Sequence, residues 1–379
     1  MFKRTAAAFL CILMTVLTAS CTGQSSTTAG NKASAAKGDT IYVLGPSPDH
    51  GWTAQAGFYA QQKVDEVNKQ GKWKAAYMSA STGEEQVDQV NTILANNNAA
   101  GVVFFALDDS AKSGQEALIA AGVPFISFDR IILGPDKSAI LNASGDNWQV
   151  GAGIAYWLTK NGMKPGSTMV TLIGDNGTVC QRRQEGFEQW LRGEIDYSDD
   201  YTKQKYHVDT PWTQDQINAL TADYKTVCNW SADGAYGYLE QKLPEIVAKA
   251  KANDGNLYIY SMDDEMTFGM LNLIESNALD AAVKTDLENL NVSISAIGGM
   301  AELYAVMDGT GTQAPTAAKY FDHMMSMYFS PIMMKNVIGY MEDYLNGNNW
   351  TYKPGDGKYE PTWIVDAGNV SKFQGFTGH

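Results

Sequence analysis

Two pairs of adjacent acidic residues, each after an apolar segment, are the plainest candidates for catalytic chemistry in this chain. The two pairs are Asp108-Asp109 and Asp263-Asp264. Two carboxylates placed on either side of a bond can act as acid and base in hydrolysis. Neighbours in a chain, however, point in different directions. Neither pair therefore predicts a hydrolase.

Other motifs of catalysis or metal binding are missing from the sequence. The histidines are scattered, without the short helical spacing of a zinc site, at His50, His207, His323 and His379. There is no Gly-x-Ser-x-Gly elbow. The segment Gly174-Asp175-Asn176-Gly177 lacks the third glycine of a dinucleotide fingerprint and the lysine of a phosphate loop. The sequence thus predicts no catalytic residue, no metal and no cofactor, and the protein is not expected to be an enzyme.

The first residues have the pattern of an export signal. Lys3 and Arg4 precede an apolar stretch over 6–17, which is too short to span a membrane. The segment ending in Cys21 resembles a bacterial lipobox, although the large aliphatic residue stands four places before the cysteine. We expect a signal peptide over 1–20 and a lipidated Cys21 that begins a flexible tether over 21–38. The alternative is ordinary cleavage with Cys21 unmodified.

Charge and length narrow the class of protein further. The formal charge is −14, and removal of Lys3 and Arg4 takes it to −16. Nucleic acid is not expected as a partner, because phosphate binding requires a basic surface. About 340 residues follow the tether, enough for two domains of ordinary size. Cys180 and Cys228, the only cysteines of that part, are too few for a disulfide scaffold.

Short apolar runs alternate with amphipathic stretches along most of the chain. This pattern predicts an α/β protein built from βαβ units with parallel sheets. The expected strands are 41–45, 74–78, 101–106, 124–128, 168–174, 257–262 and 293–297. The expected helices are 55–68, 84–96, 110–121, 149–161, 183–192, 237–252, 266–277 and 331–345. Ligands of such sheets bind beyond the carboxyl ends of the strands, so the residues there are the candidates for function.

The segments at those strand ends carry a family resemblance. They are Asp49-His50-Gly51-Trp52, Phe128-Asp129-Arg130, the stretch 177–183, Trp230 and the stretch 262–266. In this order they resemble the periplasmic sugar-binding proteins of the ribose, galactose and arabinose importer type. The resemblance implies the type I periplasmic-binding-protein fold, with two Rossmann-like lobes and a three-segment hinge. It implies an N-terminal lobe of 39–145 plus 330–357 and a C-terminal lobe of 146–329 plus 358–379.

The resemblance also implies a set of ligand-binding residues. They are His50, Trp52, Gln89, Asp129, Arg130, Arg182, Trp230, Asp263 and Glu302. Sugar hydroxyls need donors and acceptors such as Asp129 and Arg130, and the C–H faces of a sugar pack on aromatic rings such as Trp52 and Trp230. A one-residue gap leaves Arg183 as an alternative to Arg182.

Two departures from the family pattern concern the edge of the site. Where the family has Gly-aromatic-Asp, this chain has Gly298-Gly299-Met300-Ala301-Glu302, so either Glu302 takes over the acceptor role or that acceptor is lost. An insertion over 193–227, rich in Tyr and acidic residues, is expected to reshape the rim of the cleft. Both Cys180 and Cys228 are placed by the resemblance on cleft-end loops of one lobe, and export makes a disulfide between them plausible.

The function implied is that of a monomeric, extracytoplasmic binding protein. It would capture a monosaccharide by hinge closure and deliver it to the permease of an ABC importer, anchored by its lipid at the outer face of the cell membrane or in the periplasm. A receptor that presents its ligand to a membrane sensor is the alternative. Nucleosides, polyols and furanosyl signals also remain open as ligands, because two Trp faces would stack a base equally well.

Overall fold

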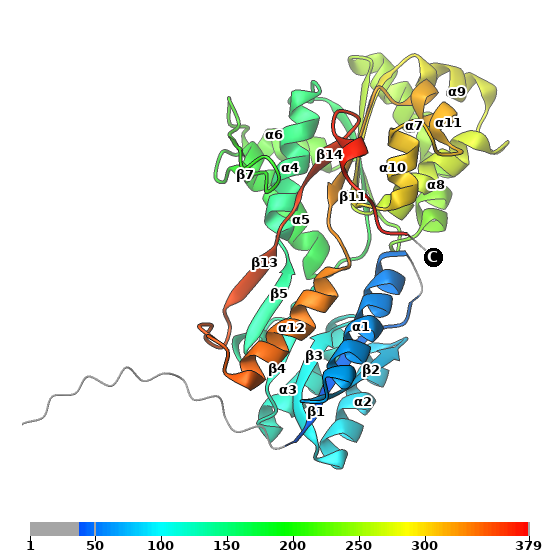
Figure 1. Ribbon diagram of the computed structural model, residues 1–379. Helices are drawn as coiled ribbons and strands as arrows, with labels where there is room; N and C mark the ends of the chain where they lie inside the picture. Colours follow the sequence, from blue (N-terminus) through cyan, green and yellow to red (C-terminus); the bar gives the residue numbers. More distant parts are fainter. Residues whose placement is uncertain (1–37, 49–50, 378–379) are drawn as a thin grey trace, which may run out of the picture. The chain divides into compact units, whose positions relative to one another are not determined.

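The computed structural model describes residues 38–48 and 51–377, and within them the chain forms two six-stranded sheets (Figure 1). The predicted signal peptide, tether and lipidated Cys21 lie outside the described residues, as does His50. Within the described ranges no helix combines the length and the apolar character that crossing a bilayer requires.

The first sheet has the strand order β13-β5-β4-β3-β1-β2, and all its strands are parallel. The strands are β1 (Thr40–Pro46), β2 (Lys74–Ala80), β3 (Ala99–Phe105), β4 (Phe125–Phe128), β5 (Leu141–Gly145) and β13 (Gly357–Glu360). The helices of this lobe are α1 (Gly51–Gln70), α2 (Gly83–Asn96), α3 (Lys112–Ala121) and α12 (Met333–Asn346). Helix α1 packs on α12 and α2 packs on α3, so one pair covers each face of the sheet.

The second sheet has the order β14-β12-β11-β10-β6-β9, with only β14 antiparallel. Its strands are β6 (Thr168–Ile173), β9 (Tyr224–Val227), β10 (Asn256–Ser261), β11 (Asn291–Gly298), β12 (His323–Tyr328) and β14 (Trp363–Asp366). Its helices are α4 (Asn147–Lys160), α5 (Thr178–Leu191), α6 (Gln214–Thr221), α7 (Ala232–Asn253), α8 (Asp264–Glu275), α9 (Ala281–Glu288), α10 (Ala301–Met307) and α11 (Ala314–Tyr320). Helices α4 and α5 pack together, as do α7 and α8.

Burial of both faces explains the sequence of the central strands. Every residue of β1 and of β3 is buried, and these strands read as continuous apolar runs because helices cover both sides of the sheet. The edge strand β2 begins with the exposed Lys74, and most of its residues are only half-buried. The prediction of an α/β fold with parallel sheets is confirmed.

The chain crosses between the sheets at three places: after β5, after β12, and between β13 and β14. The predicted lobe boundary at residue 357 falls at the start of β13, which pairs with β5 in the first sheet. Strands β5 and β12 were not predicted. The sequence of β5, Leu-Asn-Ala-Ser-Gly, has no apolar run, and that of β12 is rich in Met instead of β-branched residues.

The insertion over 193–227 lies against the third crossing. It contains the hairpin of β7 (Tyr197–Ser198) and β8 (Lys205–Tyr206), followed by α6 and β9. The Asp200 carboxylate accepts a hydrogen bond from Thr362 N at 3.0 Å, and Asp199 accepts one from Ile364 N at 3.2 Å. The insertion therefore braces the connection between β13 and β14.

Candidate functional site

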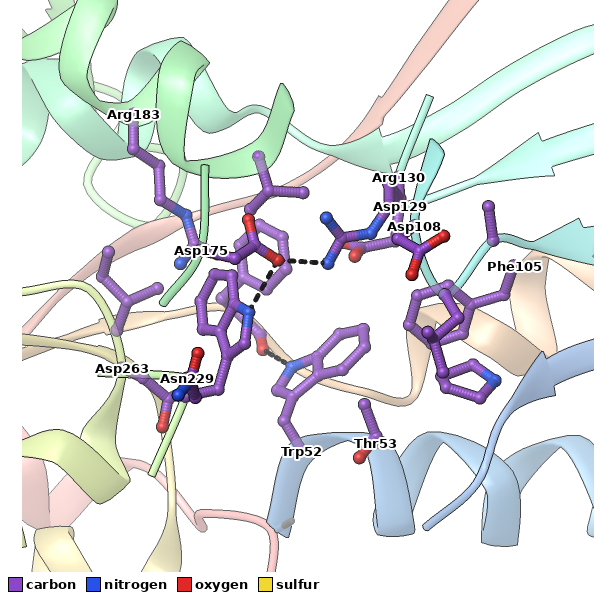
Figure 2. A pocket seen from close by; sticks show the side chains of 18 of the residues that line it. Trp52, Thr53, Phe105, Asp108, Asp129, Arg130, Asp175, Arg183, Asn229 and Asp263 are labelled. Atoms are coloured by element: carbon purple, nitrogen blue, oxygen red, sulfur yellow. Dashed lines mark hydrogen bonds and ion pairs between the residues drawn. The ribbon is translucent and has the colours of Figure 1, made fainter. Parts of the chain in front are cut away.

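A cavity of about 360 Å³ lies at the carboxyl ends of the strands, lined by residues of both lobes (Figure 2). Such a volume is within the range of small-molecule sites. The first lobe contributes Trp52, Thr53, Phe105, Asp108, Asp129 and Arg130. The second lobe contributes Asp175, Arg183, Asn229, Trp230, Asp263, Gly298 and the crossing residue Phe329. None of the insertion residues 193–227, all of which the structure describes, is among them.

Asp129 is fixed at the end of the buried strand β4. Its backbone takes a left-handed conformation, with φ of 58°, and its N–H donates to Ala143 O at 2.9 Å. Such a conformation is uncommon for a residue with a side chain and is often found at functional sites. Burial raises the pKa of Asp129, while the nearby Arg183 and Arg130 act against that rise. No described residue forms a hydrogen bond to this carboxylate, so it offers acceptors to a ligand.

Arg130 spans the space between the lobes. Its Nη2 lies 2.7 Å from Asp175 Oδ2, and its guanidinium is largely buried. Its Nε is buried and has no hydrogen-bond partner among the described residues. The side chain thus has one donor engaged in an ion pair across the pocket and another unused.

Arg183, and not Arg182, faces the pocket. Arg183 is 3 % exposed, and its Nε and Nη1 donate to Asn147 Oδ1 at 2.8 Å and to Met262 O at 2.6 Å. Its guanidinium also lies over the Phe329 ring, 4.9 Å from the centroid. Arg182, one position earlier on α5, lies outside the pocket over the ring of Trp148 at 4.6 Å. Arg183, the alternative that the one-residue gap left open, is therefore the arginine that lines the pocket.

Trp52 is both a pocket residue and a core residue. Its side chain is 8 % exposed and packs against Phe105, Phe128 and Phe329. The indole Nε1 donates to Phe329 O at 2.6 Å, which joins α1 to the second crossing. Trp52 can therefore offer only part of its ring to a ligand.

Trp230 lies in a loop with unusual backbone conformations. Asn229 and Trp230 both have positive φ, of 53° and 56°. The indole packs directly on the backbone of Gly174, where a Cβ would stand 2.1 Å from the ring, and its Nε1 donates to Asp175 Oδ2 at 2.9 Å. The half-buried ring is held at the pocket by this glycine and this carboxylate.

Asp263 lines the pocket and also caps helix α8. Its carboxylate accepts from Glu265 N at 2.8 Å, and burial raises its pKa. The neighbouring Asp264 points away into the protein, where it accepts from Gly299 N and Met300 N, both at 2.7 Å. These bonds shape the turn that replaces the family's Gly-aromatic-Asp segment.

Besides Arg182, two predicted ligand residues lie outside the pocket. Glu302 is an exposed residue in the first turn of α10 and does not line the cavity. Gln89 lies on α2 and donates to Ser79 O at 2.7 Å, also away from the cavity.

The expected disulfide is not formed. Cys180 and Cys228 are free, buried thiols, and burial raises the pKa of each to about 11. Neutral thiols of this kind are inert packing groups.

Several pocket residues were not predicted: Thr53, Phe105, Asp108, Asp175, Asn229 and Phe329. Asp108 and Asp175 follow β3 and β6, so the rule that ligands bind at strand ends would have found both. Phe329 could not be found in this way because β12 was not recognised. No cluster of acidic, histidine or cysteine residues suited to a metal occurs in ranges 38–48 and 51–377.

Comparison with known proteins identifies the family to which the chain belongs. The model of the periplasmic binding protein domain matches residues 41–320, well over half of the chain. A search of curated proteins found no match.

Three solved structures illustrate the shared fold. One is the arabinose-transporter binding protein of Shewanella sp. ANA-3, bound to arabinofuranose, with a TM-score of 0.62, 15 % identity and coverage of 88 % of this chain and 93 % of that one. A Chloroflexus aurantiacus carbohydrate transporter solute-binding protein in complex with D-glucose has a TM-score of 0.61, 17 % identity and coverage of 88 % and 94 %. The Caulobacter myo-inositol binding protein has a TM-score of 0.62, 15 % identity and coverage of 88 % and 95 %. The chain belongs to the periplasmic binding protein family, a family of binding proteins and not of enzymes.

Proposed function

We propose that this protein captures a neutral monosaccharide, or a cyclic polyol of similar size, in the cavity between its lobes and delivers it to an ABC importer. The observation that carries this proposal is that one cavity is lined by the carboxylate of Asp129, the guanidinium of Arg130 and the indole rings of Trp52 and Trp230. The open carboxylate of Asp129 can accept from two neighbouring hydroxyls, and Arg130 Nε and Arg183 can donate to ring or hydroxyl oxygens. Trp52 and Trp230 supply apolar surface for the C–H faces.

The charge of the pocket favours a ligand without a negative charge. Four aspartates, Asp108, Asp129, Asp175 and Asp263, line the cavity, against two guanidinium groups. One of these, Arg130, is already paired with Asp175, and the other, Arg183, donates to protein oxygens. A sugar phosphate or a uronate would place its charge beside uncompensated carboxylates, which is costly in a partly desolvated site.

Structural neighbours support the same class of ligand without narrowing it. The ligands of those three proteins are arabinofuranose, D-glucose and myo-inositol. All three are small, uncharged rings that carry several hydroxyls. A nucleoside would need room for a base between the two indoles, and Trp52 offers too little free ring for such a stack.

The remaining parts of the proposal concern transport. The ligand would be bound by a monomer whose lobes close around it, and the closed form would be recognised by the transporter's permease. Export by the signal over 1–20 and lipidation at Cys21 would hold the protein outside the cytoplasm, at the membrane. Replacement of Cys21 by Ala should release the protein from the membrane fraction if the anchor is present, and should leave its distribution unchanged if it is not.

A thermal-shift screen of the full chain tests the proposed ligand class. The panel should contain pentoses, hexoses, inositols, nucleosides and the matching uronates and sugar phosphates. A ligand that binds only the native state, at a concentration of a hundred times its dissociation constant, adds about 2.7 kcal/mol to the free energy of unfolding. Such a gain is readily seen as a rise in Tm. We expect a neutral sugar or polyol to raise the Tm of the wild type but not of Asp129→Ala. A shift produced only by nucleosides or only by charged sugars would contradict the proposal.

A further inference from the structure

The Asp175 carboxylate joins three segments at the edge of the pocket. Its Oδ2 accepts from Arg130 Nη2 at 2.7 Å and from Trp230 Nε1 at 2.9 Å (Figure 2). Its Oδ1 accepts from Gly177 N at 2.7 Å. Arg130 belongs to the first lobe, whereas Asp175 and Trp230 belong to the second. A single carboxylate oxygen is therefore shared between a donor of each lobe.

The environment of Asp175 keeps it charged. Burial alone would raise the pKa of Asp175, but Arg130 and the Trp230 indole N–H hold it below the ordinary value. The side chains of the pair are only 11 % and 29 % exposed, for Arg130 and Asp175 respectively. Water and salt screen a pair in such a site less than they screen one on the surface. The bond is of the charge-assisted kind, which is short and stronger than a neutral hydrogen bond.

The backbone around Asp175 is shaped to let both partners approach. A Cβ on Gly174 would lie 2.1 Å from the Trp230 ring, and a Cβ on Gly177 would lie 2.2 Å from Arg130 Nη1. Any side chain at either position would push one partner away from the carboxylate. Gly174 and Gly177, on either side of Asp175, thus leave the space that Trp230 and Arg130 need in order to reach the Asp175 carboxylate.

We propose that Asp175 is a positioning residue that latches the two lobes together and, by the same bonds, orients Arg130 and Trp230 toward the cavity. Its carboxylate would favour the closed arrangement because only there does it accept from Arg130. The Trp230 bond remains within one lobe, so it keeps the carboxylate aimed across the cleft. This role depends on the two-lobed fold and not on the identity of the ligand.

The latch can be tested on the full chain without any sugar. Spin labels on non-natural side chains at the exposed positions Lys69 of α1 and Gln241 of α7 would report the distance between the lobes. We expect Asp175→Asn to reduce the ratio of closed to open molecules by roughly tenfold, since it removes one charge-assisted bond. Asp175→Glu, which keeps the charge, should restore part of the closed population.

A matched control and a second variant keep the test decisive. Asp286 forms an ion pair with Lys251 wholly within the second lobe, so Asp286→Asn should leave the distance distribution unchanged. Gly177→Ala keeps the carboxylate but displaces Arg130, and it should open the lobes as Asp175→Asn does. If both latch variants show the wild-type distribution, the proposal is overturned. If Asp175→Asn does not fold, a wild-type distance distribution in Gly177→Ala overturns the proposal by itself.

Discussion

Trp52 and Trp230 are the same residue type at the edges of one pocket, but the protein holds them in different ways. Trp52 is part of the aromatic core around Phe105 and Phe329, and its N–H is bonded to a backbone carbonyl at a crossing between lobes. Trp230 sits half-buried on a loop with positive φ, and its N–H is bonded to a side chain. The Trp52 ring is thus held by packing in the core, whereas the Trp230 ring is held by contacts with pocket residues. Substitutions should therefore separate stability from binding.

The largest difference is expected in stability. Trp52→Ala should lower the free energy of unfolding by about 3 to 5 kcal/mol, because it leaves a cavity among buried aromatic rings. Trp230→Ala should cost about 1 to 2 kcal/mol, since the ring is only half-buried and the strained loop can relax. Urea denaturation followed by circular dichroism measures both variants. Equal losses would show that the two rings have the same structural role.

The next effect distinguishes Arg183 from Arg182. Arg183→Ala should weaken ligand binding by about 2 to 4 kcal/mol, because it removes a cation near Trp230 and leaves Asn147 Oδ1 and Met262 O without their donor. Arg182→Ala should change affinity by less than about 0.5 kcal/mol, since its guanidinium lies outside the pocket. Calorimetry on the two variants decides between them. A larger loss for Arg182→Ala would restore the position expected from the family pattern.

The carboxylates beside the two rings predict a dependence on pH. Burial raises the pKa values of Asp129 and Asp263 above the ordinary 3.8, so each takes up a proton at a higher pH than a free carboxyl group does. Protonation removes an acceptor, and affinity should fall by up to about tenfold per pH unit below the higher of these values. Affinity for a neutral sugar, measured against pH, should lose part of this dependence in Asp129→Asn and part in Asp263→Asn. A flat profile in the wild type would show that neither group titrates on binding.

The smallest effect is spectroscopic. Ligand contact replaces water at the exposed part of an indole, so the more exposed Trp230 should produce most of the fluorescence change on binding. The change should fall by more than half in Trp230→Phe and by less in Trp52→Phe. Equal contributions from both rings would support symmetric stacking instead.

The strands that were predicted correctly are those whose residues show a clear apolar pattern. Strand β4, Phe-Ile-Ser-Phe, is short, mostly apolar and fully buried, and Asp129 and Arg130 follow it at once, so both residues were expected at the ligand-binding end of the sheet. Strand β12 has a Met-rich sequence with no such pattern, and Phe329 at its end was missed with it.

Side-chain direction was harder to predict than position. Neighbouring residues on a helix differ by about 100° in direction, so a single-residue gap decides whether Arg182 or Arg183 faces the pocket. The disulfide expectation failed for a related reason. Placement of two cysteines at one end of a lobe does not by itself provide the distance and the orientation that a bridge requires. In this structure Cys180 and Cys228 are instead separate thiols packed in the apolar interior.

Calorimetric titration of the wild type and of Asp129→Ala, with the neutral sugar found by the thermal screen and with its uronate, tests the central claim most directly. The claim predicts a dissociation constant for the neutral sugar on the order of 1 μM or tighter, which is about −8 kcal/mol. It predicts that Asp129→Ala binds the neutral sugar roughly a hundredfold more weakly than the wild type does. It also predicts that the wild type binds the uronate no more tightly than Asp129→Ala binds the neutral sugar. Near-native affinity in Asp129→Ala, or a uronate that binds as tightly as the neutral sugar, would contradict the claim.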